Sequence, residues 1–422
     1  MKRNPEQILR AYEDAKKIYA AYGVDTDAAI AIFKTIPITL HNWQGDDVVG
    51  FEQHGDVHSE NVVTGNYPGR ARNGEEMRMD IDKAFSLSPT KPRVNLHSMY
   101  GEPGTTERNL QTTEDFRGWI DWAKQRGYAM DFNVSFFTHP MMKDGCSLAS
   151  PDKATRDYWI KAGKSGRAIA NDIGRELGEV CVNNIWVPDG TKDVPADRFA
   201  YRARLADSLD EILSVNYDKA NVRDVLEGKL FGIGTECFTV GSHEFYLAYA
   251  ATHGIGVCMD TGHYHPTESI VDKISAVYPY IDTLLLHISR GVRWDSDHVL
   301  TQGDDLSAIM QQVVRGHLYD SGKVFMGLDY FDATVNRVGA WAIGLRAAGK
   351  ALLEALIEPY PILQKAELDG DLTARLALLD EFRNLPSNAV WDYLCYTRGV
   401  PVGTEWIDNL KAYEADVQSK RA

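Results

Sequence analysis

Six side chains that can bind a metal ion lie in one short part of the chain, between Cys258 and His298. They are Asp260, His263, His265, His287, Asp295 and Asp297. Carboxylates and imidazoles together suit divalent cations such as manganese, magnesium or zinc, whereas a site built from cysteine thiolates selects softer metals. The types and spacing of these residues therefore predict that the chain binds one or two divalent cations.

The candidate ligands follow short β-rich runs that alternate with helical patterns. Eight runs are expected to be strands: 38–43, 93–98, 129–136, 180–187, 230–236, 254–260, 283–289 and 323–329. Most are almost continuously apolar, as parallel strands buried on both faces are. This pattern predicts an α/β fold, the (β/α)8 barrel or TIM barrel, with a doubly wound open sheet as the alternative. Polar residues end most of the runs, which favours the barrel because its strand ends converge on one face.

The chain is expected to divide into an N-terminal helical segment at 1–37, the catalytic barrel at 38–345 and a C-terminal helical extension at 346–422. The extension is rich in alanine, leucine, glutamate and lysine, which favour helices, and it exceeds what the eighth barrel helix needs. We therefore expect extra N-terminal and C-terminal helices besides the barrel, and expect the C-terminal extension to pack against a neighbouring segment or a partner subunit.

Charge and composition narrow the class of partner. The chain of 422 residues has a formal net charge of −15, which argues against nucleic acid and anionic membranes because both attract basic surfaces. It has no apolar run of the roughly eighteen residues that a membrane span needs, and its charged N-terminal helix does not resemble a signal peptide. The five cysteines are scattered without a CxxC pair. We predict a cytoplasmic protein that acts on a small molecule.

The candidate ligands separate into two sets. Four end the fifth to eighth predicted strands: Glu236, Asp260, His287 and Asp329. Three lie in the loops that follow: His263, Asp295 and Asp297. Any one of them alone is more often a helix cap or a loop hydrogen-bond acceptor, but all seven at one barrel end would repel strongly without cations. The first set predicts a closed metal site, the second an open site that leaves positions for substrate, and His265 is expected to belong to neither.

Aromatic side chains near the strand ends form a second layer. Trp43 and Trp186 are the leading candidates for an apolar wall that carries the carbon face of a sugar, ahead of Phe136 and Trp294. His97 is the leading candidate for a hydrogen bond to a sugar hydroxyl or ring oxygen. Each aromatic residue could instead pack at the rim, and His97 could be a strand-end histidine whose partners are all internal.

Long segments of the chain resemble those of bacterial L-rhamnose isomerases. They are LHNWQGDDVVGFE, TGNYPGRARN, NIWVPDGTKD, KLFGIGTE, MDTGHYHPTE, LLLHISRGVRWDSDHV and GLDYFDATVNRVGAW. The resemblance covers almost the whole chain and implies a (β/α)8 barrel, a homotetramer and two divalent metals, commonly Mn²⁺, with Zn²⁺, Mg²⁺ or Co²⁺ as alternatives. It implies that His263, Asp295 and Asp297 hold a catalytic metal, and that Glu236, Asp260, His287 and Asp329 hold a structural one.

The implied reaction is the reversible conversion of L-rhamnose to L-rhamnulose by a metal-assisted hydrogen shift between C1 and C2. Asp329 and His97 are expected to act in catalysis, and Trp43, His97 and Trp186 to bind the sugar. Related xylose isomerases place a lysine two residues after the strand-five glutamate, but Phe238 stands two residues after Glu236. The lysine is therefore expected to be absent or replaced from another loop, for example by Lys192.

Three other functions stay open at this point. The chain could isomerise a different aldose, act as a metal-dependent phosphodiesterase, or bind a sugar without catalysis. The acidic net charge disfavours the phosphodiesterase, and an open metal position disfavours binding alone.

Overall fold

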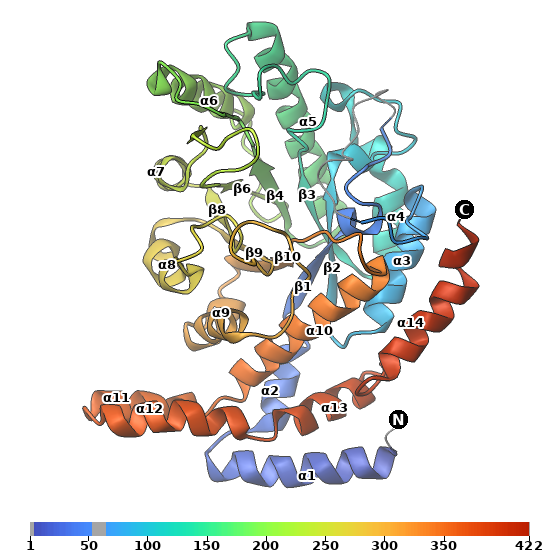
Figure 1. The fold of residues 1–422 in the computed structure, drawn as a ribbon, viewed down its shortest axis with the longest axis vertical. Helices are drawn as coiled ribbons and strands as arrows, with labels where there is room; N and C mark the ends of the chain where they lie inside the picture. Colours follow the sequence, from blue (N-terminus) through green and yellow to red (C-terminus); the bar gives the residue numbers. More distant parts are fainter. Residues whose placement is uncertain (1–3, 53–64, 422) are drawn as a thin grey trace.

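The computed structural model describes residues 4–52 and 65–421, so the outermost residues of the two expected terminal segments lie outside it. Eight parallel strands of this part of the chain close into a barrel in the order β1-β10-β9-β8-β6-β4-β3-β2 (Figure 1). The predicted barrel is confirmed, and the open sheet is excluded. The strands are β1 Pro37–His41, β2 Lys91–His97, β3 Ala129–Asn133, β4 Cys181–Trp186, β6 Val222–Glu227, β8 Gly256–Asp260, β9 Leu284–Ile288 and β10 Val324–Leu328.

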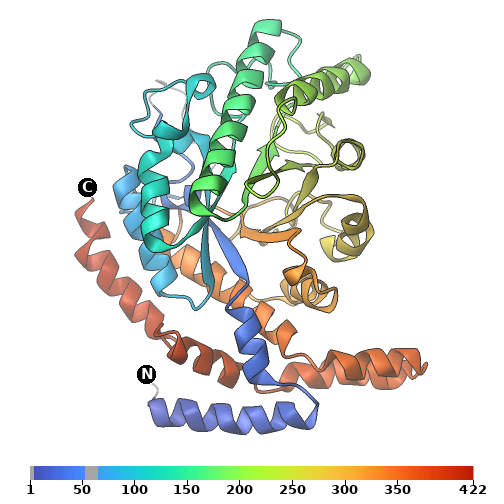
Figure 2. The same cartoon turned by 180° about the vertical axis from the view of Figure 1, so that it is seen from behind.

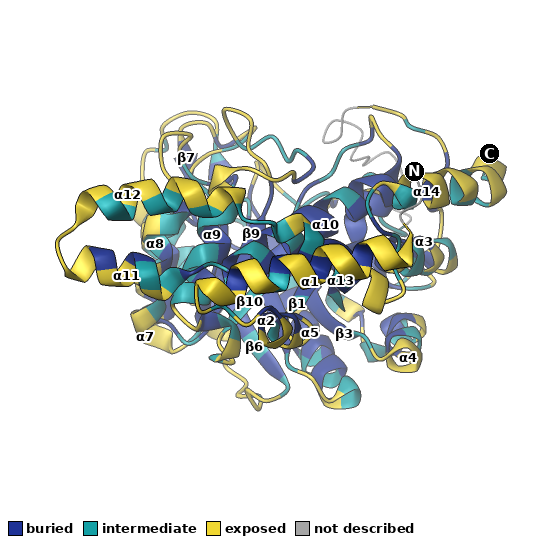
Figure 3. Cartoon of the chain, turned by 90° about the horizontal axis from the view of Figure 1, so that it is seen from below, coloured by how far each residue is buried: buried dark blue, intermediate teal, exposed yellow. Residues whose placement is uncertain are grey.

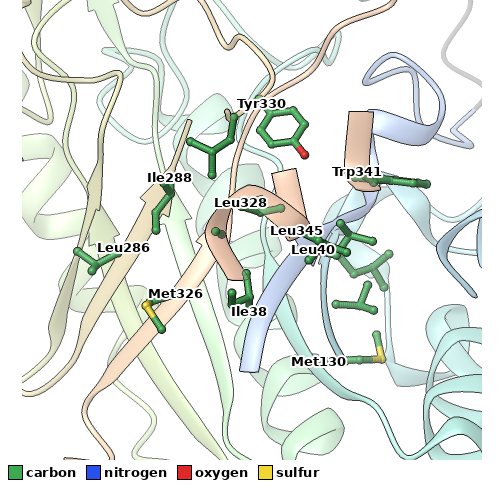
Figure 4. Packing of buried hydrophobic residues seen from close by; sticks show 14 of the residues in the cluster. Ile38, Leu40, Met130, Leu286, Ile288, Met326, Leu328, Tyr330, Trp341 and Leu345 are labelled. Atoms are coloured by element: carbon green, nitrogen blue, oxygen red, sulfur yellow. The ribbon is translucent and has the colours of Figure 1, made fainter. Parts of the chain in front are cut away.

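Alternation along the strands decides which side chains reach the inside of the barrel. Figure 4 shows Leu286 and Ile288 of β9, and Leu328 and Tyr330 at the end of β10, among the buried apolar side chains that pack between the strands and the outer layer. Successive side chains of a strand point to opposite faces. The polar residues between these apolar ones, His287 and Asp329, therefore face the inside of the barrel.

Helices cover the outside of the barrel, and each strand is followed by one (Figure 2). They are α3 Gly74–Ser86, α4 Arg117–Arg126, α5 Lys153–Leu177, α6 Arg198–Ile212, α7 His243–His253, α8 Ile270–Val277, α9 Asp304–Arg315 and α10 Arg337–Leu356. Gly254 caps α7 with φ +64°, a left-handed conformation that glycine adopts without steric cost. Each βα unit thus returns the chain to the same end of the barrel.

Further helices lie beyond both ends of the barrel sequence. They are α1 Pro5–Ala21, α2 Thr26–Phe33, α11 Tyr360–Leu368, α12 Leu372–Glu381, α13 Ser387–Thr397 and α14 Glu405–Asp416. The N-terminal and C-terminal helical segments contact each other where Tyr12 of α1 stacks on Tyr393 of α13, with ring centroids 3.7 Å apart. Figure 3 shows that α11 and α12 carry much exposed surface. The division into three segments stays a prediction, and α10 is continuous across the expected boundary at 345–346.

One of the eight predicted strands is wrong. The run 230–236 lies in the loop after β6, where Leu230, Phe231 and Ile233 are exposed. The true fifth strand, β6, carries three charged residues and so lacks an apolar signal. One of them, Asp224, is buried because it pairs with Arg167 of α5 at 2.9 Å. A charge pair between distant residues therefore allows this strand to be polar, and the strand was not recognised from the sequence. The apolar, glycine-containing loop that follows was predicted to be the strand instead.

Two smaller findings complete the architecture. The loops after β4 and β6 pair in a short antiparallel sheet, β5 Gly190–Thr191 with β7 Phe238–Thr239, that the sequence did not predict. Among the described residues, no helix has the length and apolar character needed to cross a membrane.

Candidate metal centre and active site

The ends of four neighbouring strands bring together one group of potential ligands. It consists of Glu227, Asp260, His287 and Asp329, whose ligand atoms all lie within 4.8 Å of one another. Nδ1 of His287 is central: it lies 3.2 Å from Asp329 Oδ2, 3.4 Å from Glu227 Oε2 and 4.0 Å from Asp260 Oδ2. Strand pairing fixes the backbone beneath them, because Asp260 of β8 is in register with His287 of β9. We call these four residues the strand-end group.

Glu236 is not part of this group, and its placement at a strand end is wrong. It lies in the loop that was mistaken for the fifth strand, and its side chain is exposed. Glu227, the last residue of β6, is only 3% exposed and occupies the position expected of Glu236. The error follows directly from the misplaced strand, since the strand end was read from an apolar run.

A second group lies beside the first. Ligand atoms of Asp260, His263 and Asp295 fall within 4.8 Å of one another, so Asp260 belongs to both groups. His263 Nε2 lies 3.6 Å from Asp295 Oδ2, and His263 Nδ1 lies 3.2 Å from Glu227 Oε1. We call His263 and Asp295 the loop pair. Asp297 is near both, but none of its atoms joins either set of ligand atoms among the described residues.

The electrostatics of the two groups favour bound cations. Burial, and then the charges of Asp329, Glu227 and Asp295, raise the pKa of Asp260 well above its usual range. Burial, and then the charge of Asp295, do the same to the pKa of Asp297. Both ring nitrogens of His287 are buried without a hydrogen-bond partner in the described structure. Crowded carboxylates beside a buried imidazole form a donor set that fits divalent cations.

A second layer of hydrogen bonds orients the candidate ligands. The Asn184 side-chain amide donates to Glu227 Oε2. The indole N–H of Trp43 donates to Asp329 Oδ1 at 3.1 Å, and the backbone N–H of Gly262 donates to Asp260 Oδ1 at 2.6 Å. Each such bond restricts the rotation of a carboxylate and so reduces the entropy that binding an ion would cost. Trp43 was predicted from the sequence to form part of an apolar wall, and it also donates a hydrogen bond to the candidate ligand Asp329.

The lysine that seemed to be missing is present. Lys229 stands two residues after Glu227, and its ammonium Nζ lies 2.5 Å from Asp295 Oδ2. Burial alone lowers the pKa of Lys229, but the Asp295 carboxylate outweighs burial and raises it, so Lys229 is charged. Lys192, considered as a substitute, is exposed. The expected vacancy was wrong for the same reason as Glu236: both followed from the misplaced fifth strand.

Aromatic rings line one side of the two groups in an unbroken series. Trp43 contacts His97 edge-on with centroids 4.5 Å apart, His97 contacts Phe137 at 5.4 Å, and Phe137 contacts Trp186 at 5.2 Å. Trp186 in turn stacks beside His263 at 6.2 Å. Phe137 is the member that sequence reasoning missed.

The other two aromatic candidates do not join this series. Phe136 is fully buried against Trp159, and Trp294 is 47% exposed. β3 ends at Asn133, and even a strand that continued to Phe136 would have directed that residue outward, on the same face as Phe132. His265 is exposed and bonds to Thr267, away from both groups.

His97 is held inside the protein on both sides of its ring. Its Nδ1 lies 3.1 Å from the Ser135 hydroxyl oxygen, and the Asn133 side-chain amide donates to its Nε2 at 3.3 Å. It is 5% exposed, and burial lowers its pKa to about 3, so the ring is neutral. His97 therefore contributes a flat apolar face to the wall while both nitrogens are engaged by the protein.

Comparisons with known proteins identify the family of the chain. Residues 6–421 match the L-rhamnose isomerase family. An L-rhamnose isomerase of Rhodopirellula baltica is 52% identical over 98% of this chain and 97% of its own length. Another, from Mannheimia succiniciproducens, is 49% identical over 98% and 99%. A solved L-ribulose 3-epimerase shares the fold at 14% identity, with a TM-score of 0.50 over 79% of this chain and 97% of that one. The chain belongs to the L-rhamnose isomerase family.

Proposed function

We propose that the protein is an L-rhamnose isomerase, an enzyme that interconverts the aldose L-rhamnose and the ketose L-rhamnulose. The observation that carries this proposal is the pair of adjoining ligand groups that share Asp260, with the charged Lys229 beside them. Two adjoining positions match a substrate that presents oxygens on neighbouring carbons, as C1 and C2 of an open-chain aldose do. Membership of the family supports the choice of sugar.

We further propose that each group binds one divalent cation, with Mn²⁺ as the metal of choice. Glu227, Asp260, His287 and Asp329 would hold one, and Asp260 and the loop pair, with Asp297 adjoining, would hold the other. Cations bound there would act as Lewis acids that polarise the C1 and C2 oxygens and orient them. Oxygen and imidazole ligands also accept Zn²⁺, Mg²⁺ and Co²⁺, so loading experiments decide the metal.

The chain's own residues account for the handling of the sugar. Lys229, beside Asp295, would donate a hydrogen bond to the carbonyl oxygen at C1. Asp295 Oδ1 is buried without a partner in the described structure and can hold the proton that moves between O1 and O2. The indole N–H of Trp186 is likewise buried and unpartnered, and can donate to a sugar hydroxyl. The remaining rings of the wall cover the carbon face and exclude water.

The wall also bears on how hydrogen moves between the carbons. An enediol path needs a base beside C2. His97 is the titratable member of the wall, and both of its nitrogens have protein partners. We therefore expect direct hydride transfer from C2 to C1. If the reaction is run in deuterated water, the product is then expected to carry no deuterium at C1. Deuterium at C1 would instead show a proton-transfer path.

Restoring metal to chelator-treated protein tests the proposal as a whole. L-rhamnulose is expected to form from L-rhamnose after addition of Mn²⁺ and not before. Failure with each of Mn²⁺, Co²⁺, Zn²⁺ and Mg²⁺ would overturn it. The same assay with other aldoses that share the C2 and C3 stereochemistry is expected to show weaker activity, because an apolar wall discriminates modestly between hydroxyl variants.

We also propose that the enzyme is a homotetramer. Leu368, Leu372 and Leu376 of the α11–α12 hairpin are 80%, 59% and 66% exposed, and burial between subunits would remove this apolar surface from water. Light scattering of the full chain is expected to give four times the 47.2 kDa mass of one chain. The cytoplasmic location stays a prediction.

A further inference from the structure

A cavity of about 290 Å³ lies outside the barrel, lined by residues of the helices α7 and α8 and of the strands β6 and β8. Its volume is near the lower end of small-molecule pockets, and it is about twice the size of a cavity that holds one benzene ring. A molecule with a two-ring skeleton therefore fits it. No residue of the strand-end group or of the loop pair lines it.

The walls of the cavity suit a planar apolar group. Leu226 of β6, Val257 and Met259 of β8, and Val277 of α8 supply aliphatic surface. His243 and Tyr264 add an aromatic wall: their rings stack on each other with centroids 3.9 Å apart and planes 6° from parallel, and Lys273 Nζ lies 5.1 Å from the centroid of the Tyr264 ring. Aromatic rings pack against such a surface with both dispersion and stacking.

Charges at the rim favour a cationic group on the same molecule. The carboxylates of Glu244 on α7 and Asp272 on α8 both line the cavity and both belong to exposed residues. Lys273 also lines it, but its Nζ is paired with Glu268 Oε2 at 2.6 Å. The charge left at the rim is therefore negative, and it complements an ammonium group.

The strands that line the cavity also carry two of the candidate metal ligands. Leu226 and Met259, which line it, are the strand neighbours of Glu227 and Asp260. The His243 ring N–H donates to the backbone carbonyl oxygen of His263 at 2.9 Å. An occupant that contacts His243 thus acts one hydrogen bond away from the loop pair.

We propose that this cavity is a binding site for a small aromatic amine. The ring lies against the His243–Tyr264 wall, and the ammonium group faces Asp272 and Glu244. We further infer that binding is coupled to the loop pair through the bond from His243 to His263. The binding site stands independently of the proposed function, whereas the coupling rests on it.

Calorimetric titration of the full-length protein with tryptamine tests the binding. We expect one saturable site per chain with a dissociation constant of about 1 mM or tighter, as the ligand efficiency of small molecules implies. Tryptophol, which replaces the ammonium with a hydroxyl group, is expected to bind more weakly. Absence of saturable binding of tryptamine at about tenfold this concentration overturns the proposal.

Matched variants locate the site. Ala276→Trp fills the cavity from an exposed position of α8 and is expected to weaken tryptamine binding at least tenfold. Ser275→Trp adds the same ring at the neighbouring exposed position, which does not line the cavity, and is expected to change nothing. Equal effects of the two variants would place the binding elsewhere and contradict the proposal.

A second pair tests the charge. Asp272→Asn is expected to weaken tryptamine about threefold, as for an exposed ion pair, and to leave tryptophol unchanged. Asp305→Asn, at an exposed position of α9 outside the cavity, is the control. If Asp272→Asn leaves tryptamine unchanged, the assignment of the ammonium group is wrong.

The coupling has its own readout. Saturating tryptamine is expected to change the affinity of the protein for Mn²⁺ measured by calorimetry, and Mn²⁺ to change the affinity for tryptamine by the same factor. His243→Phe keeps a ring but removes the bond to His263, so it is expected to abolish the coupling, with neither ligand changing the affinity for the other. Tryptamine binding with unchanged Mn²⁺ affinity overturns the coupling and leaves the site. Loss of isomerase activity in the metal-restoration assay, with tryptamine binding intact, counts against the proposed function alone.

Discussion

The strand-end group and the loop pair consist of similar side chains, but the backbone that carries them differs. Glu227, Asp260 and His287 lie within a hydrogen-bonded ladder and are each at most 3% exposed. Asp295 lies in a loop that has left-handed backbone at Arg293 and Asp297, and its side chain pairs with Lys229. The difference indicates a division of labour, in which the strand-end group binds a cation rigidly and the loop pair meets the reacting sugar.

The largest effect is expected from Asp295→Asn, which removes the carboxylate between Lys229 and His263. Turnover is predicted to fall about 1,000-fold or more, as when a charge-stabilising group is lost from an active site. The circular dichroism spectrum is expected to stay that of the folded barrel, because the strand-end group is untouched. Activity within about tenfold of the parent would show that the loop pair is not where the chemistry occurs.

Lys229→Met also tests the loop pair, because it removes the charge next to Asp295 and keeps a side chain of similar length. We predict a fall in kcat of about 100-fold, since the hydrogen bond to the carbonyl oxygen is lost while the aliphatic stem remains. Lys192→Met, at an exposed position, is the control and is expected to be unchanged. Mn²⁺ affinity of the strand-end group should stay near the parent value, and a large drop there would contradict the division of labour.

Trp43→Phe probes the strand-end group from its second layer. The variant keeps an aromatic ring but loses the N–H that donates to Asp329. We predict about tenfold weaker Mn²⁺ binding, the lower end of the range for such partners. Trp186→Phe, which loses an N–H without a partner, is expected to raise KM for the sugar and leave Mn²⁺ binding unchanged. Identical effects of the two variants would remove the distinction between the two tryptophans.

A carboxylate outside both groups shows what burial does without a cation. Asp46 accepts hydrogen bonds from the Tyr100 hydroxyl and the Gly50 N–H, and burial raises its pKa to about 7. The folded state therefore keeps this proton while the unfolded state releases it, so the contribution to stability falls as pH rises from about 4 to 7.

The smallest effect follows from this linkage. Asp46→Asn is predicted to flatten the fall in the free energy of unfolding over that pH window, measured by urea titration of metal-free protein. Parallel pH profiles of the variant and the parent would show that Asp46 does not titrate with a raised pKa.

The sequence predicted the barrel and most of its strands because buried parallel strands are apolar runs with polar ends. Asp260, His287 and Asp329 could be placed at those ends for the same reason. Glu227 could not, since β6 is charged and its buried Asp224 is compensated by Arg167, a residue distant in the sequence. The lone signal for it was the spacing Glu227–Lys229, which matches the glutamate and lysine of related isomerases. The internal partners of His97 and the contact of Phe137 with two other rings depend on tertiary packing, which periodicity does not encode.

The central claim is that Glu227, and not Glu236, completes the strand-end group, and one paired measurement tests it directly. Mn²⁺ binding to Glu227→Gln and Glu236→Gln is compared by calorimetry at the same pH. We predict that Glu227→Gln weakens the tighter site about 100-fold, as expected when a buried carboxylate ligand loses its charge, and that Glu236→Gln binds like the parent. Weakened binding in Glu236→Gln together with parental binding in Glu227→Gln would contradict the account.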